Sequence, residues 1–358
     1  MGGAVEKVWF ALGREFVKLG HEVTHISRQH QDLPASEIID GVCCRRVPGF
    51  DAPRSLVRLK VLDLIYSIRV LRALPPADVL VTNTFFLPIL TRDVTRGKIY
   101  VHVARYPKGQ MRLYGRASRL QTVSRTVADA IGREAPRLMS KVRVIPYPSI
   151  ENRVINVMTA RTESREKVLL FVGRVHPEKG LELLIRAVSS IPRNQLEGWR
   201  LVIVGPSEVR FGGGGAKYLR HLQAVAEPIA DRVDWVGPVF APKALAEFYR
   251  RAAVFVYPSL ADRGETFGLA PLEAMAHGCV PVVSSLECFT EYVEDRINGI
   301  VFEHEGSRPE QNLARELMGL LSEPARVAEI SRAAQLTSCD YALDRIVALY
   351  LADFSSLH

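Results

Sequence analysis

Short runs rich in Val, Ile and Leu alternate with amphipathic segments along nearly the whole chain. Six such runs lie in the first part, at 21–27, 41–47, 77–83, 98–103, 120–124 and 141–146. Five more lie in the second part, at 167–173, 200–205, 231–237, 253–258 and 280–285. Strands that alternate with helices are typical of doubly wound parallel sheets. We therefore predict an α/β fold with two Rossmann-like domains in tandem.

A polar segment without sustained periodicity separates the two arrays of strands. It spans 151–167 and is the best candidate for a linker. We expect an N-terminal domain over 1–155 and a C-terminal domain over 156–342. The helical pattern at the end predicts a helix within 343–358 that packs back on the N-terminal domain. A chain of 358 residues is long enough for two such cores.

The first array lacks the strand with which a Rossmann-like half normally begins. Such a half starts with a strand that leads into a glycine turn and then a helix. This chain starts at the turn itself, Met1-Gly2-Gly3-Ala4. We therefore expect the first strand of the N-terminal domain to be missing. Either the true start lies upstream or the first sheet is incomplete, and the pattern does not choose between the two.

Composition excludes several classes of protein. Apolar residues make up 47% of the chain, but none of their runs approaches the roughly 18 residues of a membrane span. Charged residues at helical intervals near the start, among them Glu6, Lys7 and Arg14, argue against a signal peptide. Five cysteines without a C-x-x-C pair fit neither a disulfide framework nor a zinc site. We expect a cytoplasmic protein with reduced thiols.

The net charge of +8 is distributed unevenly, which suggests an anionic partner. Residues through Ala160 include 25 basic and 13 acidic side chains, so the remainder is net negative. The arginines between Arg45 and Arg143 lie mostly among aliphatic rather than aromatic residues, so nucleic acid is not expected. The basic amphipathic segment 56–74 fits a crossover helix packed on the sheet. It also fits a helix that associates with an anionic membrane surface.

The richest motif for chemistry is SLADRGETFGLAPLEAMAHGCVP, at 259–281. If a helix begins near Gly268, Glu273 lies about 7 Å along it and Glu265 lies in the preceding loop. The amide groups at a helix N-terminus attract anions, and carboxylates accept hydrogen bonds from hydroxyl groups. This layout suits a nucleoside diphosphate sugar. The alternative is an ordinary amphipathic helix with Glu273 in solvent.

A second motif, LLFVGRVHPEKGLELLIRA at 169–187, predicts a strand, a glycine turn and a helix. Arg174 and Lys179 lie around the turn, and both side chains donate hydrogen bonds to phosphate. The alternative is a surface loop with a Glu178–Lys179 charge pair. The chain contains no Asp-x-Asp motif to bind a metal ion against phosphates. We therefore expect no metal, with Arg174 and Lys179 in its place.

Several other residues are weaker candidates. His102 ends a predicted strand, the place where open α/β sheets present groups to ligands, although a lone histidine is usually structural. We interpret His176 and His277 as structural. The four glycines 212–215 do not open a phosphate-binding loop and predict a flexible connection.

Together these residues resemble the retaining glycosyltransferases of the GT-B fold, group 1 (family 4). The resemblance extends over essentially the whole chain, and E-x7-E in ETFGLAPLEAMAHGCVPVV and the GRVHPEKG loop are its most specific parts. It implies two Rossmann-like domains that face a cleft. It also implies a donor-binding set: Gly2, Gly3, Gly173, Arg174, Lys179, Phe267, Gly268, Leu269 and Glu273. The implied catalytic set is His102, Arg174, Lys179 and Glu265.

The resemblance also implies individual roles. Arg174 and Lys179 bind the donor diphosphate, Glu273 binds the ribose hydroxyls, and Glu265 contacts the transferred sugar. His102 lies beside that sugar. Two places depart from the family: Tyr147-Pro148 replaces Asn-Gly after the last strand of the first domain, and Glu287-Cys288 replaces two glycines before Glu291.

The expected function is transfer of a hexose from a nucleoside diphosphate sugar to an acceptor hydroxyl, with retention of configuration. The acceptor is a glycan or a lipid-linked glycan, and neither a metal nor a cofactor is expected. An anionic membrane surface is a further expected partner of the basic N-terminal domain. Two alternatives stay open: a nucleotide-sugar epimerase of the same architecture, and a non-catalytic module that binds sugar nucleotides or membranes.

Overall fold

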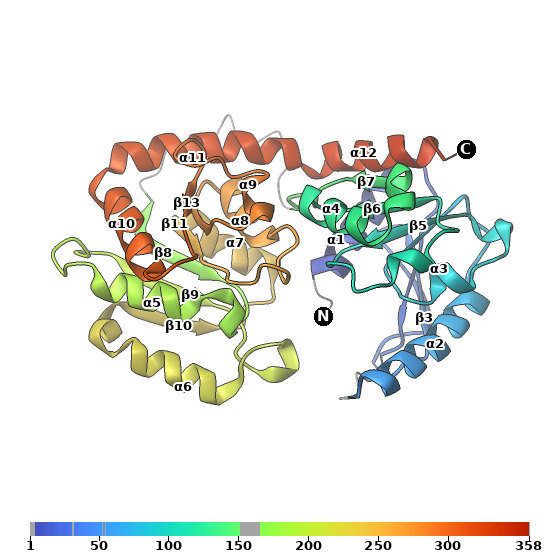
Figure 1. Ribbon diagram of the computed structural model, residues 1–358, viewed down its shortest axis with the longest axis horizontal. Coiled ribbons are helices and arrows are strands. Elements are labelled where there is room, and N and C mark those ends of the chain that lie inside the picture. Colours follow the sequence, from blue (N-terminus) through green and yellow to red (C-terminus); the bar gives the residue numbers. More distant parts are fainter. Residues whose placement is uncertain (1–3, 31, 52, 54, 151–164, 358) are drawn as a thin grey trace. The chain divides into compact units, whose positions relative to one another are not determined.

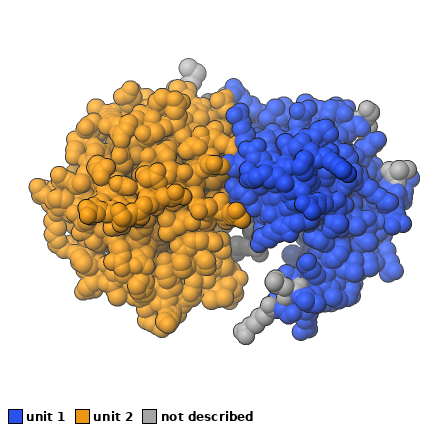
Figure 2. Space-filling model, viewed as in Figure 1, with its two compact units in different colours: residues 1–148, 343–358 blue, residues 149–342 orange. Residues whose placement is uncertain are grey.

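The computed structural model describes residues 4–30, 32–51, 53, 55–150 and 165–357. The chain divides into two compact units, which Figure 2 shows in different colours. Unit 1 comprises residues 1–148 and 343–358, and unit 2 comprises residues 149–342. Both are built from helices and sheets whose strands pair parallel except for β2 with β3, so the predicted α/β class is confirmed. Most of the predicted linker, 151–164, and Gly2 and Gly3 lie outside the described residues.

Unit 1 contains two sheets (Figure 1). The first has the order β1-β3-β2, from β1 (Thr24–Arg28), β2 (Ser36–Ile39) and β3 (Val42–Val47). The second is parallel, with the order β4-β5-β6-β7. Its strands are β4 (Val79–Thr82), β5 (Lys98–Val103), β6 (Arg119–Thr122) and β7 (Val142–Val144). Among the described residues, helix α1 (Ala4–Lys18) is the first element of unit 1.

Strand β2 was not predicted. It pairs antiparallel with β3 around Asp40 and Gly41, which have φ angles of 49° and 83°. Two central residues with positive φ define the type I′ turn of a tight hairpin, for which Asp-Gly is a preferred sequence. The dipeptide was therefore the signal for this hairpin, although the run before it is too short and polar to stand out.

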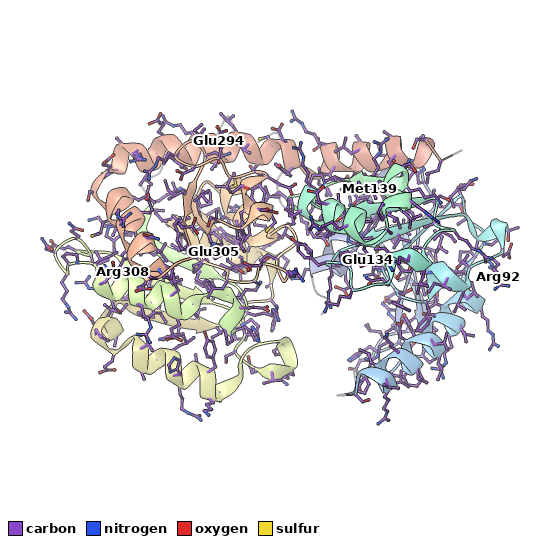
Figure 3. The ribbon with its side chains drawn as sticks, viewed as in Figure 1. Arg92, Glu134, Met139, Glu294, Glu305 and Arg308 are labelled. Atoms are coloured by element: carbon purple, nitrogen blue, oxygen red, sulfur yellow. The ribbon has the colours of Figure 1, made fainter. Side chains whose placement is uncertain are left out.

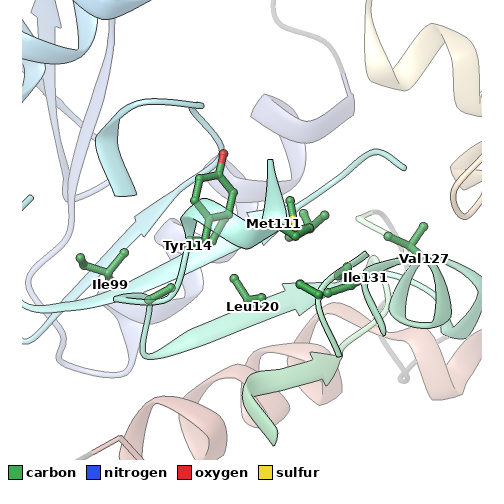
Figure 4. Close-up of a cluster of buried hydrophobic side chains, with 10 residues drawn as sticks. Ile99, Met111, Tyr114, Leu120, Val127 and Ile131 are labelled. Carbon is green, nitrogen blue, oxygen red and sulfur yellow. The ribbon is translucent and has the colours of Figure 1, made fainter. Parts of the chain in front are cut away.

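The core of the second sheet is a cluster of buried side chains from β5, β6 and the helix α4 (Arg125–Glu134) (Figure 4). Ile99, Leu120 and Ile131 belong to this cluster. The other helices of unit 1 are α2 (Leu56–Ala73), the short α3 (Leu87–Leu90) and α12 (Leu343–Ser355). Helix α2 connects the two sheets, and its Val70 packs in a buried cluster with Val47 of β3 and Leu80 of β4, so one face of the helix is packed.

Helix α12 is part of unit 1 and is anchored by one buried carboxylate. Asp353 accepts a hydrogen bond of 2.9 Å from the hydroxyl of Tyr100 and pairs with Arg119 at 2.8 Å. The ring of Tyr350 contacts the ring of Trp9 in α1. The end of the chain is thereby joined to β5, β6 and α1.

Unit 2 has one parallel sheet of six strands in the order β10-β9-β8-β11-β12-β13. The strands are β8 (Glu166–Val172), β9 (Arg200–Val204), β10 (Val233–Gly237), β11 (Ala252–Tyr257), β12 (Val280–Ser284) and β13 (Ile300–Phe302). The helices are α5 (Leu181–Ser190), α6 (Gly215–Val225), α7 (Pro242–Arg251), α8 (Leu269–Ala276), α9 (Glu287–Thr290), α10 (Pro309–Ser322) and α11 (Pro324–Ser338). Among the strands that the structure describes in unit 2, only β13, which has three residues, lacked a prediction.

The strand order places a topological switch point between β8 and β11. Successive connections run from β8 toward β9 and β10 on one side, and from β11 toward β12 and β13 on the other. In open α/β sheets, ligands bind beyond the carboxyl ends of the strands at such a point. All residues of β11 and β12 are buried, as expected for strands covered on both faces. No helix in the described part of the chain is long and apolar enough to cross a membrane.

Candidate active site

The two motifs singled out from the sequence meet at the switch point of unit 2. Gly173 and Arg174 follow β8, and Pro258 and Ser259 follow β11. The loop after β8 leads through the 3₁₀ helix Pro177–Lys179 into α5, and the loop after β11 leads into α8. Backbone contacts join the two loops, because the carbonyl of Glu178 accepts hydrogen bonds from the Leu260 amide at 2.8 Å and the Ser259 hydroxyl at 3.2 Å.

A buried ion pair lies at this junction. The ammonium of Lys179 contacts Oε1 of Glu265, and the two side chains are only 9% and 8% exposed. The hydroxyls of Tyr257 and Ser259 reach the same oxygen at 3.0 and 3.4 Å. Burial raises the pKa of Tyr257 well above its usual value, so its hydroxyl remains a hydrogen-bond donor at neutral pH. This carboxylate oxygen thus receives donors from Lys179 and Tyr257, while the single Ser259 proton is shared with the closer carbonyl of Glu178.

The Glu178–Lys179 charge pair of the alternative interpretation does not form. Glu178 instead pairs with Arg174 at 2.5 Å, while Lys179 turns to Glu265. Tyr257 and Ser259 were not identified from the sequence as site residues. Their signal was available, because Tyr257 lies at the end of a predicted buried strand and Ser259 directly follows it, at the edge where α/β sheets bind ligands.

Gly180 allows the close approach of the two loops. Its φ is +66°, and a Cβ at this position would collide with the backbone carbonyl of Pro258. Only glycine adopts this conformation at low cost and leaves room for the neighbouring chain. A larger residue would push Lys179 away from the loop that contains Glu265.

Arg174 lies at the rim of the same site and is held by two acceptors. Its guanidinium donates to Glu178 at 2.5 Å and to the carbonyl of Gly212 at 3.0 Å. The glycines that the sequence predicted to be a flexible connection are hydrogen bonded: Gly214 donates to Val175 at 2.8 Å and Gly215 donates to Ser207 at 2.7 Å. The glycine segment therefore packs beside the Arg174 loop.

The N-terminus of α8 lies where the sequence predicted it. Gly268 caps the helix with φ +81°, and Leu269 is the first helical residue. The hydroxyl of Tyr292 donates to the carbonyl of Gly268 at 2.7 Å, and Phe267 packs against the ring of Tyr292. This terminus is thereby fixed, with its positive dipole end at the loop that contains Glu265.

Glu273 lies within α8 and is partly buried, so the alternative of a fully solvent-facing carboxylate does not hold. The hydroxyl of Tyr249 is 3.4 Å from its Oε2. Tyr249 in turn stacks on His277, which has the structural role predicted for it. His176, also predicted to be structural, accepts the Glu178 amide at 3.4 Å and caps the 3₁₀ helix.

The Glu287-Cys288 departure from the family pattern lies in α9, close to the buried ion pair. Glu287 is exposed, whereas Cys288 is 3% exposed. Burial raises the pKa of the Cys288 thiol, and the nearby charge of Glu265 acts in the same direction. Cys288 is therefore a neutral thiol that fills space beside Glu265, where the family has a glycine.

His102 lies in unit 1 and is buried at 2% exposure. Its Nδ1 is 2.5 Å from Oε1 of Gln121, and its Nε2 is 3.1 Å from the hydroxyl of Tyr147. The amide nitrogen of Gln121 donates to two backbone carbonyls, so its oxygen accepts the Nδ1 proton. Nε2 then accepts from Tyr147. Contact of a substrate with either ring nitrogen would require one of these hydrogen bonds to break.

The stability of unit 1 should depend on pH because the His102 ring is buried. Burial lowers the pKa of His102 to about 4, although the hydrogen bond with Gln121 opposes the shift. An unfolded histidine takes up a proton near pH 6.5, so the contribution of His102 to stability is present above pH 6.5 and is lost as the pH falls toward 4. We expect a loss of about 3 kcal/mol over this range. Hydrogen exchange of the β5 amides would measure it.

The comparison is the His102→Gln variant, which should lack this part of the pH dependence. His277, whose pKa is also lowered to about 4 by burial and by neighbouring arginines, lies in unit 2 and is not reported by β5 amides. If the stability of unit 1 falls equally with pH in the wild-type protein and in the variant, His102 is not buried as a neutral ring.

One group of side chains in unit 2 has the composition of a metal site. Ligand atoms of Asp262, His304 and Glu305 lie within 4.8 Å of one another. Asp262 and Glu305 are exposed, and Nδ1 of His304 is 2.9 Å from the hydroxyl of Ser285. Exposed acidic groups of this kind are common, and the contacts of Lys179 and Glu265 do not involve them.

Comparison with known proteins places this site in a family. The model of the family described as glycosyl transferases group 1 matches residues 159–337, which contain both motifs. The D-inositol 3-phosphate glycosyltransferase of Acidothermus cellulolyticus is 32% identical over 226 residues, 60% of this chain and 46% of the relative. The protein of the same name from Segniliparus rotundus is 31% identical over 170 residues, 47% of this chain and 35% of the relative. The chain thus spans less than half the length of these two relatives.

Solved structures share the fold over the whole chain. A sucrose-phosphate synthase from Thermosynechococcus elongatus has a TM-score of 0.79 at 19% identity, covering 99% of this chain and 94% of its own. The Anabaena protein HepE, solved with UDP and glucose, has a TM-score of 0.74 at 17% identity, covering 99% and 96%. With its two motifs inside the matched region, the chain belongs to the group 1 glycosyltransferases.

Proposed function

We propose that this chain transfers a hexose from a nucleoside diphosphate sugar to an acceptor hydroxyl on a glycan or a lipid-linked glycan, with retention of configuration. The observation that supports this most is the contact of Lys179 with Glu265 at the switch point. A cation beside a carboxylate suits a diphosphate bound next to sugar hydroxyls, because phosphate accepts hydrogen bonds and hydroxyls donate them. HepE, whose fold this chain shares, was solved with UDP-glucose.

Arg174 and Lys179 would bind the diphosphate and stabilise the charge that grows on it as its bond to the sugar breaks. An ammonium has three N–H donors, so Lys179 can contact a phosphate oxygen and keep Glu265. Glu265 would accept from hydroxyls of the transferred sugar and Glu273 from those of the ribose. The departing phosphate oxygen would take the acceptor proton on the same face. This scheme uses neither a metal nor a cofactor.

A panel of nucleoside diphosphates tests the donor site. UDP, GDP and ADP are each added to the chain. The one that binds best should raise the free energy of unfolding by about 2.7 kcal/mol when it is present at 100 times its dissociation constant. Glu273→Gln should reduce the effect, whereas Glu247→Gln, on the exposed face of α7, should not. No stabilisation by any of the three would contradict the proposal. Release of an epimer from donor alone, without a glycan product, would favour an epimerase instead.

We also propose that an anionic membrane surface is a partner of unit 1, through the outer face of α2. Val57, Val61, Ile65 and Ile68 are 75%, 51%, 37% and 37% exposed. Their spacing places them on one face of a helix with 3.6 residues per turn, opposite the buried Val70. Arg58 and Arg72 lie beside them. An exposed apolar stripe with basic neighbours is typical of helices that bind at the membrane interface.

Val57→Asp should weaken binding to vesicles that contain phosphatidylglycerol by about tenfold, because burial of one such side chain contributes roughly 1.5 kcal/mol or more. The matched control is Val209→Asp, since Val209 in unit 2 is 74% exposed and the charge change is the same. Vesicle sedimentation measures the bound fraction. An equal loss in both variants would show that only net charge matters and that α2 is not the contact.

A further inference from the structure

A hollow in unit 1 has an unusual lining. Its volume is about 370 Å³, and it is lined by Ile89, Arg92, Arg112, Leu113, Gly115 and Arg116. Three of these six residues are arginines and none is acidic. Figure 3 labels Arg92.

This hollow lies at the end of the sheet opposite to the edge where α/β proteins bind substrates. Arg92 precedes β5 along the chain, and Arg116 lies three residues before the start of β6, so both lie near the amino ends of these parallel strands. His102 lies toward the carboxyl end of β5. The arginine hollow is therefore a place separate from the residues of the proposed transferase reaction.

Among the described residues, the arginines of the hollow have no ion-pair partner. Arg92, Arg112 and Arg116 form no ion pair with a described carboxylate. A hollow of unit 2 offers a contrast: Arg296, Arg315 and Arg326 line it, but so does Glu316, which Arg296 contacts at 3.0 Å. The arginine hollow of unit 1 thus has no acidic lining residue among the described residues, whereas the hollow of unit 2 has one.

The backbone that presents two of these arginines is firmly anchored. Arg112 lies in a 3₁₀ helix between Met111 and Tyr114, both of which are buried in the core (Figure 4). The carboxylate of Glu134, labelled in Figure 3, accepts the amides of Gly109 at 2.7 Å and Met111 at 2.6 Å. The hydroxyl of Tyr114 donates to a backbone carbonyl at 3.2 Å.

Further contacts fix the remaining parts of the hollow. Lys141 donates to the carbonyls of Gly115 at 2.7 Å and Ala117 at 2.9 Å, on either side of Arg116. The Nε of Arg112 donates to the Glu134 carbonyl at 3.0 Å, which leaves its terminal nitrogens for another acceptor. Arg92 follows Thr91, a buried residue whose hydroxyl donates to the carbonyl of Leu87 at 2.8 Å. Such preorganisation lowers the entropy lost on binding.

We propose that Arg92, Arg112 and Arg116 bind the phosphomonoester group of a ligand. Guanidinium groups donate paired hydrogen bonds that match phosphate oxygens, and a phosphomonoester carries close to two negative charges near neutral pH. The volume falls within the range of about 300–1,000 Å³ typical of small-molecule sites. Ile89 and Leu113 offer apolar contact to the carbon atoms next to the phosphate. Such a group occurs on soluble phosphate esters and on phosphatidic acid.

The experiment compares the intact chain with Arg92→Gln/Arg116→Gln, which leaves the Arg112–Glu134 hydrogen bond in place. The control is Arg315→Gln/Arg326→Gln, with the same charge change in the hollow of unit 2. The soluble probe is glycerol 3-phosphate, with hydrogen exchange of residues 109–117 as a readout specific to the site. The lipid probe is vesicles with phosphatidic acid, compared with phosphatidylglycerol vesicles of equal charge.

We expect one of the two probes to bind the Arg92→Gln/Arg116→Gln variant at least tenfold more weakly than it binds the intact chain. The same probe should bind the control variant as tightly as the intact chain. Protection of 109–117 by glycerol 3-phosphate would identify a soluble ester as the ligand. Preference for phosphatidic acid without such protection would identify a lipid headgroup. Absence of binding by both probes to the intact chain, or equal binding to both double variants, would overturn the proposal. Neither readout requires transferase activity, so the result is independent of the proposed reaction.

Discussion

Replacing Arg174 by alanine is expected to lower turnover with the nucleotide-sugar donor by about 100- to 1,000-fold, the effect of losing one donor to a charge that develops in the transition state. The free energy of unfolding should change by less than about 1 kcal/mol, because the ion pair of Arg174 with Glu178 is exposed to solvent. Steady-state kinetics and urea unfolding measure the two effects.

Arg186 provides a matched control for this experiment. It pairs with Glu182 at 2.6 Å, four residues away, as Arg174 pairs with Glu178, and the two arginines are 53% and 44% exposed. Arg186→Ala therefore removes the same kind of ion pair from the same unit, but away from the switch point. Near-normal turnover of Arg174→Ala, or an equal loss in Arg186→Ala, would exclude Arg174 as a ligand of the diphosphate.

The sequence predicted the architecture well because the chain repeats one strong pattern. A continuous apolar strand such as β11 is buried on both faces, and its run of residues is therefore visible without any knowledge of tertiary contacts. β2 and β13 escaped prediction for the opposite reason. β2 alternates exposed and partly buried residues over four positions, and β13 has three residues. Such short elements depend on their neighbours more than on their own sequence.

The meeting of the two motifs in unit 2 followed from the same logic. Loops after parallel strands share one edge of a sheet, so the loops with Lys179 and Glu265 had to emerge at the same edge. The sequence pattern did not show which side chains of these two loops form a pair. The sequence offered Glu178 only as an alternative partner of Lys179, whereas in the structure Lys179 pairs with Glu265, which also accepts from Tyr257.

The hydrogen-bond partners of His102 could not be predicted from the sequence around it. Its partners Gln121 and Tyr147 come from other segments of unit 1, and nothing near His102 in the sequence points to them. Tyr147 was noted only as a departure from the family pattern. In the structure its hydroxyl hydrogen bonds to Nε2 of His102, which gives the departure a physical consequence that only the fold reveals.

The buried ion pair makes Lys179 a structural residue as well as a proposed ligand of the diphosphate. Lys179→Met should lower the free energy of unfolding of unit 2 by about 3–5 kcal/mol, because it leaves the carboxylate of Glu265 buried without its counter-charge. Hydrogen exchange of the β11 amides, which lie in the core of unit 2, measures this loss. The exposed Lys167→Met, with the same change of residue and charge, should have little effect.

A double variant separates the buried charge from other effects of the substitution. Glu265→Gln in the Lys179→Met background removes the unpaired carboxylate, and a neutral amide can still accept from the hydroxyls of Tyr257 and Ser259. Most of the lost stability should therefore return, while transfer activity should not, because the cation proposed for the diphosphate is still absent. If the double variant is as unstable as Lys179→Met, the loss comes from packing around the lysine stem rather than from the ion pair.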